Sequence, residues 1–161
     1  MTIKEGDKIP EATLMTMTDT GPKPMTTKEL FDGKKVALFS VPGAFTPTCS
    51  AQHLPGFVAN ADKLKAKGID TIACIAVNDA FVMSAWGKDR DVGDKILMLG
   101  DGNADLTKKL GLEMDASGFG LGTRGQRFSM IVDNGVVKNL NVEEGGAFEK
   151  SKAEVILQQL G

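Results

Sequence analysis

A cysteine stands where a helix is expected to begin. The segment from Val41 to Phe57 reads "VPGAFTPTCSAQHLPGF". If Thr46 is the N-cap and Pro47 the first helical residue, Cys49 lies in the first turn of that helix. Backbone N–H groups in this turn have no partner inside the helix, and together with the helix dipole they favour a thiolate over a thiol. Because the thiolate is the nucleophilic form of cysteine, this position predicts a reactive sulfur.

A fixed positive charge near Cys49 would stabilise the thiolate further. The effect of a helix end is typically about 1 kcal/mol, whereas a neighbouring cation is worth more. Arginine suits this role because it stays charged and presents a planar set of donors. The arginines of the chain are Arg90, Arg124 and Arg127. Arg127 opens a strand expected in the central sheet, where its backbone would be rigid, so it is the candidate partner of Cys49.

The second cysteine and the single histidine have weaker claims to chemistry. Cys74 lies in the middle of the apolar run "IDTIACIAV", so we expect it to be buried and inert rather than to bridge to Cys49. His53 follows Cys49 by four residues and can share a helix face with it, as the base of a cysteine hydrolase would. No partner that would orient this histidine is evident, which favours a packing or hydrogen-bonding role. Two cysteines 25 positions apart form neither a disulfide framework nor a zinc site.

Strand and helix patterns alternate around these residues. Apolar runs bounded by turn residues predict buried strands at 34–41, 69–77 and 95–101. Helices are predicted from Pro47 with a kink near Pro55-Gly56, after a cap at Asn78 or Asp79, and over 103–112. Asn134-Gly135 predicts a hairpin within 127–142, and residues 148–160 predict an amphipathic helix. This order predicts an α/β, thioredoxin-like fold with a central mixed β-sheet flanked by helices.

Length and composition exclude several classes of protein. The 161 residues are expected to form a single domain over 1–161, and the formal charge of −2 gives no case for nucleic acid or an anionic membrane as partner. No apolar run approaches the length of a membrane span, and "MTIKEGDKIP" lacks signal or transit character. The cysteine content predicts a reducing compartment, by default cytoplasmic, with an organellar form that has lost a presequence as the alternative.

No metal or organic cofactor is expected. Residues 120–125, "GLGTRG", match G-x-G-x-x-G, the pattern of a dinucleotide site. They precede a strand instead of following one, so a flexible loop that carries Arg124 is the preferred interpretation. The acidic residues in "GDGNAD" lack the spacing of a calcium loop.

"PGAFTPTCSAQHLPGF" resembles the active-site segment of the type II, or peroxiredoxin 5-like, peroxiredoxins in its P-x-x-x-T-x-x-C spacing. The likeness extends to "ACIAVNDAFVMSAWGK" and "RFSMIVDNGVVKNLNVE", and so to most of the chain. The resemblance implies that Cys49 is the peroxidatic cysteine, Thr46 the active-site threonine, Pro42 the proline that screens the sulfur and Arg127 the active-site arginine. It therefore implies an antioxidant thiol peroxidase, active in cell redox homeostasis, which reduces hydrogen peroxide and organic (alkyl) hydroperoxides through a sulfenic acid on Cys49.

The resemblance also bears on how such an enzyme would be reduced again. Many animal members carry a further cysteine near the C-terminus, and the matching stretch "EEGGAFEKSKAEVI" has none. This places the chain with the one-cysteine plant and bacterial types, whose reductant is typically glutathione with glutaredoxin and sometimes thioredoxin. A homodimer is implied as well, through apolar residues such as Phe45 and Phe81-Val82. The alternatives are a slowly reacting peroxide sensor or thioredoxin-like redox binding module, and a hydrolase that pairs Cys49 with His53.

Overall fold

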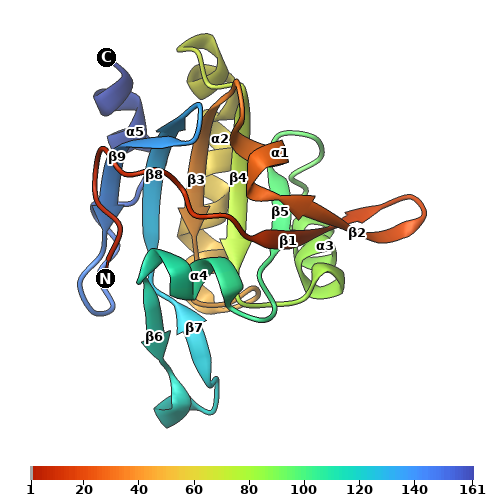
Figure 1. Ribbon diagram of the computed structural model, residues 1–161. Coiled ribbons are helices and arrows are strands. Elements are labelled where there is room, and N and C mark those ends of the chain that lie inside the picture. The colour runs from red at the N-terminus through yellow and green to blue at the C-terminus, as the bar shows by residue number, and fades with distance from the viewer. Residues whose placement is uncertain (1) are drawn as a thin grey trace.

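The computed structural model describes residues 2–161, which contain a seven-stranded sheet in the order β2-β1-β5-β4-β3-β8-β9 (Figure 1). Its strands are β1 (Thr13–Thr18), β2 (Gly21–Thr26), β3 (Lys35–Ser40), β4 (Thr71–Ala76), β5 (Leu97–Gly100), β8 (Phe128–Asp133) and β9 (Val136–Val142). Within the same range, β6 (Glu113–Asp115) and β7 (Thr123–Gly125) form a small separate sheet. The helical elements are α1 (Thr27–Phe31), the π-helical turn η1 (Cys49–His53), α2 (Leu54–Ala66), α3 (Ala80–Asp89), α4 (Asp105–Leu110), the 3₁₀ turn η2 (Ser117–Phe119) and α5 (Ala153–Leu160).

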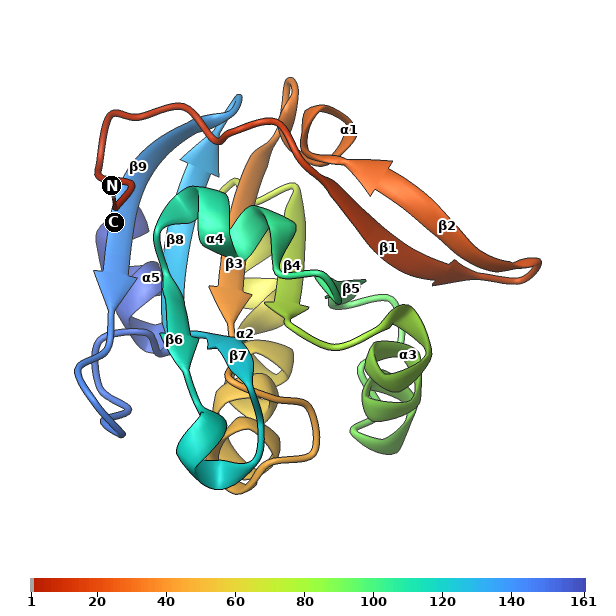
Figure 2. The same cartoon turned by 60° about the horizontal axis from the view of Figure 1, so that its bottom comes forward.

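The central sheet is mixed, as predicted. Strand β3 is parallel to β4 and antiparallel to β8, and β4 is parallel to β5. The inner strands are apolar on both faces because helices cover both sides: α2 and α5 lie behind the sheet and α4 in front of it (Figures 1 and 2). Alternate residues of β3 therefore enter different cores, Ala37 and Phe39 on the α2 side and Val36 and Leu38 on the other. The predicted thioredoxin-like arrangement is confirmed.

The predicted hairpin is also confirmed. Asn134 and Gly135 have φ angles of 49° and 81°, and they join β8 to β9. A two-residue turn with both φ angles positive matches the twist of the flanking strands, which is why Asn-Gly is favoured there.

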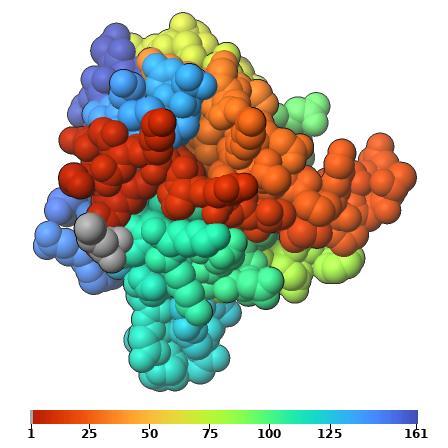
Figure 3. All heavy atoms as spheres, viewed as in Figure 1, coloured from red at the N-terminus to blue at the C-terminus, as the bar shows by residue number. Residues whose placement is uncertain are grey.

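Two segments differ in structure from what their sequences predicted. Residues 120–125 are not simply a flexible loop, because Thr123–Gly125 forms β7 and pairs with β6. This hairpin protrudes from the body of the molecule (Figures 1 and 3). The helix after β3 does not break at Pro55-Gly56, and α2 runs through both residues. The irregularity comes one turn earlier, in η1, where the hydrogen bonds span five residues instead of four.

None of the helices in residues 2–161 combines the length and the apolar character that crossing a bilayer would require.

Candidate active site

The carboxyl end of β3 leads through a short loop into the helix that carries Cys49. The backbone N–H of Ser50 donates to the carbonyl of Thr46 at 2.9 Å, so the helix begins near Pro47, as predicted. The predicted side-chain cap is wrong: the Thr46 hydroxyl donates to the carbonyl of Gly43 at 2.6 Å. That carbonyl lies three residues earlier in the tight loop, and the hydroxyl bonds to it instead of capping an N–H of the helix.

The loop before Cys49 is fixed by contacts from distant parts of the chain. Arg124 donates to the carbonyl of Pro42 at 3.2 Å, and Asn78 accepts from the N–H of Ala44 at 3.0 Å. Gly43 lies so close to Arg124 that a Cβ there would be 2.9 Å from its Nη1 atom. These contacts give Arg124 and Asn78 structural roles that the sequence analysis did not identify, because each depends on a pairing far along the chain.

The guanidinium of Arg127 lies directly beside the sulfur of Cys49. Its Nη2 atom donates to Sγ at 3.0 Å, and the side chain of Cys49 is fully buried. The backbone of Arg127 is held as well, because its carbonyl accepts from the N–H of Glu143 at 3.0 Å and its next residue begins β8. A rigid cation in contact with a buried sulfur favours the charged form of that sulfur.

The other terminal nitrogen of the same guanidinium forms a hydrogen bond with His53. Nη1 of Arg127 lies 2.8 Å from Nδ1 of His53, and Nε2 of His53 lies 3.0 Å from the carbonyl of Ser151. Because a carbonyl only accepts, Nε2 carries the hydrogen and Nδ1 accepts from Arg127. Burial, and then the charge of Arg127, lower the pKa of His53 to about 3, so the ring is neutral at physiological pH. With both nitrogens engaged, His53 is not poised to take a proton from Cys49, which argues against the hydrolase alternative.

Comparison with known proteins agrees with this arrangement. The chain matches the Redoxin family over residues 4–157. It is 54% identical to Peroxiredoxin-2E, chloroplastic, of Arabidopsis thaliana over 98% of this chain and 69% of that one, and 46% identical to Arabidopsis Peroxiredoxin-2D over 98% of both. The crystal structure of reduced Prx3 from Vibrio vulnificus in complex with H₂O₂ superposes with a TM-score of 0.96 at 57% identity, over 99% of this chain and all of that one.

The chain belongs to the type II peroxiredoxins. It is therefore an antioxidant enzyme, a thiol peroxidase that reduces peroxides at the expense of thiols. The fold and the family assignment made from the sequence are both confirmed.

Aromatic rings pack around His53 and the guanidinium of Arg127. Phe39 and Phe57 stack at 4.0 Å, and the ring of His53 lies 5.0 Å from that of Phe39. Phe148 lies 5.1 Å from the His53 ring and 5.8 Å from the guanidinium carbon of Arg127. Packing against these rings reduces the contact of the polar groups with water, which strengthens the hydrogen bonds between them.

A separate contact ties the first turn of the helix to α3. Nε1 of Trp86 donates to Oγ of Ser50 at 2.9 Å, and both side chains are buried. Since Ser50 follows Cys49 directly, this bond limits movement of the backbone that carries the sulfur. Trp86 is the one tryptophan of the chain, so its fluorescence reports on this turn.

Cys74 lies where the sequence placed it, in the middle of β4 and fully buried. Burial, and then the negative charge of Cys49, raise the pKa of the Cys74 thiol well above its ordinary value. A thiol in this environment is a poor nucleophile, so Cys74 is expected to be inert.

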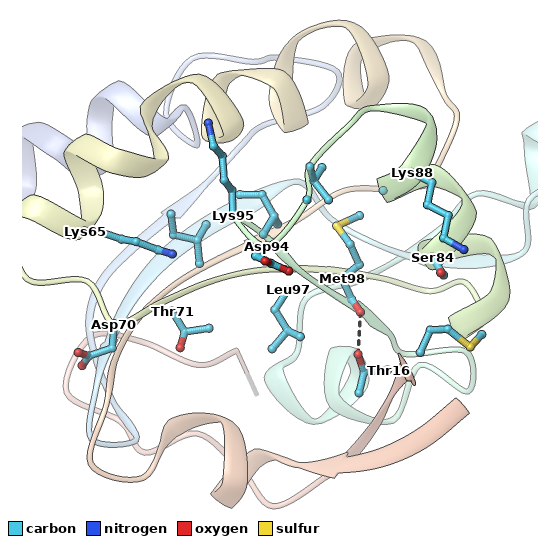
Figure 4. Close-up of a pocket in the computed structure, with 16 residues that line it drawn as sticks. Thr16, Lys65, Asp70, Thr71, Ser84, Lys88, Asp94, Lys95, Leu97 and Met98 are labelled. Atoms are coloured by element: carbon cyan, nitrogen blue, oxygen red, sulfur yellow. Dashed lines mark hydrogen bonds between the residues drawn. The ribbon is translucent and has the colours of Figure 1, made fainter. Parts of the chain in front are cut away.

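A cavity of about 470 Å³ lies at the other end of the sheet, where β4 and β5 begin (Figure 4). Its lining includes Lys65, Lys88 and Lys95, and the hydroxyl of Thr16 bonds to the carbonyl of Met98 at its edge. None of the groups around Cys49 lines this cavity, so its size does not indicate the site of the chemistry. Among residues 2–161, no three His, Cys, Asp or Glu side chains are gathered as a metal ion would require.

Proposed function

We propose that Cys49 is the peroxidatic cysteine of this peroxiredoxin and that Arg127 stabilises both its thiolate and the transition state. The observation that carries the proposal is the 3.0 Å hydrogen bond from Nη2 of Arg127 to Sγ of Cys49. The thiolate attacks one peroxide oxygen, so an S–O bond forms as the O–O bond breaks. The departing oxygen gains negative charge, takes up a proton and leaves as water or an alcohol. A guanidinium beside the sulfur is placed to stabilise this oxygen as its charge develops.

Thr46 and Pro42 complete the proposed site from the loop before the helix. The Thr46 hydroxyl donates its hydrogen bond to the carbonyl of Gly43, so its oxygen remains free to accept a hydrogen bond from an incoming peroxide. Pro42 has no backbone N–H, and its ring offers an apolar surface that would screen the sulfur from water. The substrates proposed are hydrogen peroxide and organic hydroperoxides, in line with the H₂O₂ complex named for the Vibrio relative.

An external thiol is proposed to reduce the Cys49 sulfenic acid. Cys74 cannot serve without leaving the core of the sheet, because it is fully buried in β4. The segment from Glu143 to Ile156 contains no cysteine. Glutathione with glutaredoxin is the proposed reductant and thioredoxin the alternative, as in the one-cysteine members of the family.

The protein is proposed to act as a single domain and as a homodimer. Phe45 and Phe81 are 51% and 63% exposed although they are large and apolar, which favours a surface covered by a second copy. A reducing compartment is proposed, by default the cytoplasm. An organelle is the alternative, since two of the plant relatives are named as chloroplastic.

Stopped-flow mixing of the reduced protein with hydrogen peroxide tests the proposed function. One equivalent of peroxide should disappear rapidly, and a sulfenic acid should be trapped on Cys49 and identified by mass spectrometry. Cys49→Ser should consume none, and a Cys49→Ser variant as active as the wild type would refute the assignment. A wild-type rate no higher than that of free cysteine would instead favour the sensor alternative.

A further inference from the structure

A buried carboxylate follows β9 and takes no part in the chemistry described above. The side chain of Glu143 is almost completely buried, and its Oε2 atom accepts from three donors: the N–H of Glu149 at 2.8 Å, the N–H of Ser151 at 2.8 Å and the hydroxyl of Ser151 at 2.6 Å. Burial opposes its charge, but hydrogen bonds from Ser151 and from nearby backbone groups outweigh this effect and lower the pKa of the carboxyl. Glu143 is therefore a fixed anion inside the protein.

The position of Ser151 links this anion to His53. The carbonyl of Ser151 accepts from Nε2 of His53 at 3.0 Å, which fixes the hydrogen on Nε2 and leaves Nδ1 as an acceptor. Nδ1 then accepts a hydrogen bond from Nη1 of Arg127 at 2.8 Å. Without a fixed carbonyl at residue 151, the ring could turn or change its tautomer, and Arg127 would lose a defined acceptor.

Glu143 also contacts the backbone of the same arginine. Its N–H donates to the carbonyl of Arg127 at 3.0 Å, next to the start of β8. One residue thus holds Arg127 at two places, the main chain directly and the guanidinium through Ser151 and His53. Nη2 of that guanidinium reaches Sγ of Cys49 at 3.0 Å.

We propose that Glu143 is a positioning residue for the peroxide site, which acts through Ser151 and His53 to orient the Arg127 guanidinium against the sulfur of Cys49. The proposal rests on the roles proposed for Cys49 and Arg127. Glu143 reaches these contacts through one carboxylate oxygen. Its Oε1 atom has no hydrogen-bond partner among residues 2–161, so all of the hydrogen bonds to this side chain go to Oε2.

Substitution of Glu143 tests the proposal, with Glu144 as the matched control. Glu144 is exposed and carries the same charge, and its side chain forms a salt bridge with the exposed Lys150 at 3.5 Å. Glu143→Ala should slow the oxidation of Cys49 by hydrogen peroxide about tenfold, less than the roughly 100-fold that a 1 Å misplacement of a catalytic group can cost. It should also slow the alkylation of Cys49 by iodoacetamide, which reacts with the thiolate. Glu143→Gln keeps an acceptor oxygen and should recover most of the rate, and Glu144→Ala should match the wild type in both measurements.

A double-mutant cycle separates positioning from a general loss of structure. If Glu143 acts through His53, Glu143→Ala should change the rate less than twofold in a His53→Asn background. The proposal would be overturned if the rate loss of the double variant equalled the product of the losses of Glu143→Ala and His53→Asn. It would also be overturned if Glu143→Ala reacted with hydrogen peroxide and iodoacetamide at the wild-type rates. If Glu143→Ala does not fold, Ser151→Ala replaces it in the cycle with an expected loss of about threefold, and an unchanged rate in Ser151→Ala overturns the proposal. Activity that survives Cys49→Ser would instead refute the proposed function itself.

Discussion

Mild acid is expected to destabilise this peroxiredoxin through His53. The folded protein holds the pKa of His53 at about 3, whereas the ordinary value is 6.5. As the pH falls below 6.5, the unfolded chain binds a proton that the folded chain does not. Stability is therefore fully present above the ordinary pKa and is lost progressively as the pH falls toward 3.

The size of this loss follows from the two pKa values. At pH 5 the unfolded histidine is protonated about thirtyfold more often than it is neutral, and the folded histidine remains neutral. This corresponds to about 2 kcal/mol of unfolding free energy relative to pH 7.5. The buried carboxyl of Glu143, whose pKa is lowered, stays ionised at pH 5 and adds little to the change above that pH.

Urea unfolding of the reduced protein at pH 7.5 and pH 5 measures the effect, with His53→Asn as the comparison. The variant is less stable at both pH values because it loses the contact with Ser151, but this constant loss cancels when each protein is compared with itself. The wild type should lose about 2 kcal/mol more than the variant between the two pH values. Equal losses would show that the folded histidine titrates normally, and the neutral, doubly hydrogen-bonded ring described above would be refuted.

Three further predictions concern the surroundings of the sulfur. Gly43→Ala should slow peroxide reduction in stopped flow by about tenfold, because the new methyl group would lie 3.1 Å from Cγ2 of Thr46 and 2.9 Å from Nη1 of Arg124 and would displace the loop before Cys49. Gly56→Ala, where a Cβ meets nothing within 4 Å, should react as the wild type does. Cys74→Ala should leave turnover with glutathione and glutaredoxin unchanged in a coupled assay, since the thiol is buried and inert; a large loss of turnover would give it a redox role. Ser50→Ala should cost about 1–3 kcal/mol in urea unfolding, because it leaves the buried N–H of Trp86 without its acceptor, and unchanged stability would contradict this.

Local patterns were sufficient to predict much of the fold. Asn134-Gly135 determines a hairpin by backbone preference alone, and the apolar runs of β3 and β4 predict inner strands because both of their faces are buried. Arg127 could be selected because a strand end is rigid and the chain offers few arginines. Each of these inferences needs only neighbouring residues and a preference that is strong in isolation.

The N-terminal hairpin shows where local patterns fail. Strand β2 contains Pro22 and Pro24, and prolines usually argue against a strand. They are tolerated because β2 is the outer strand of the sheet and needs no hydrogen bonds on its free side. Whether a strand lies at an edge is a property of the whole topology, so the sequence of this segment does not predict it.

The network around His53 was not predictable for a different reason. Its partner Ser151 is 98 residues away in the chain, and the contact is made through a backbone carbonyl that any residue type could supply. The role of Glu143 depends in turn on that contact. The π-helical turn at Cys49 was also not predicted, and one of its residues, Ser50, is held by a hydrogen bond from α3 that lies 36 residues away in the chain.

The contact between Arg127 and Cys49 is tested most directly by the rate at which the reduced protein reacts with hydrogen peroxide in stopped flow. The measurement is made in a Cys74→Ala background, so that only the sulfur of Cys49 can react, with and without Arg127→Gln. Loss of the guanidinium beside the sulfur should slow the reaction by about 100-fold, because a donor aimed at the developing charge is removed. An unchanged rate in Arg127→Gln would contradict the account.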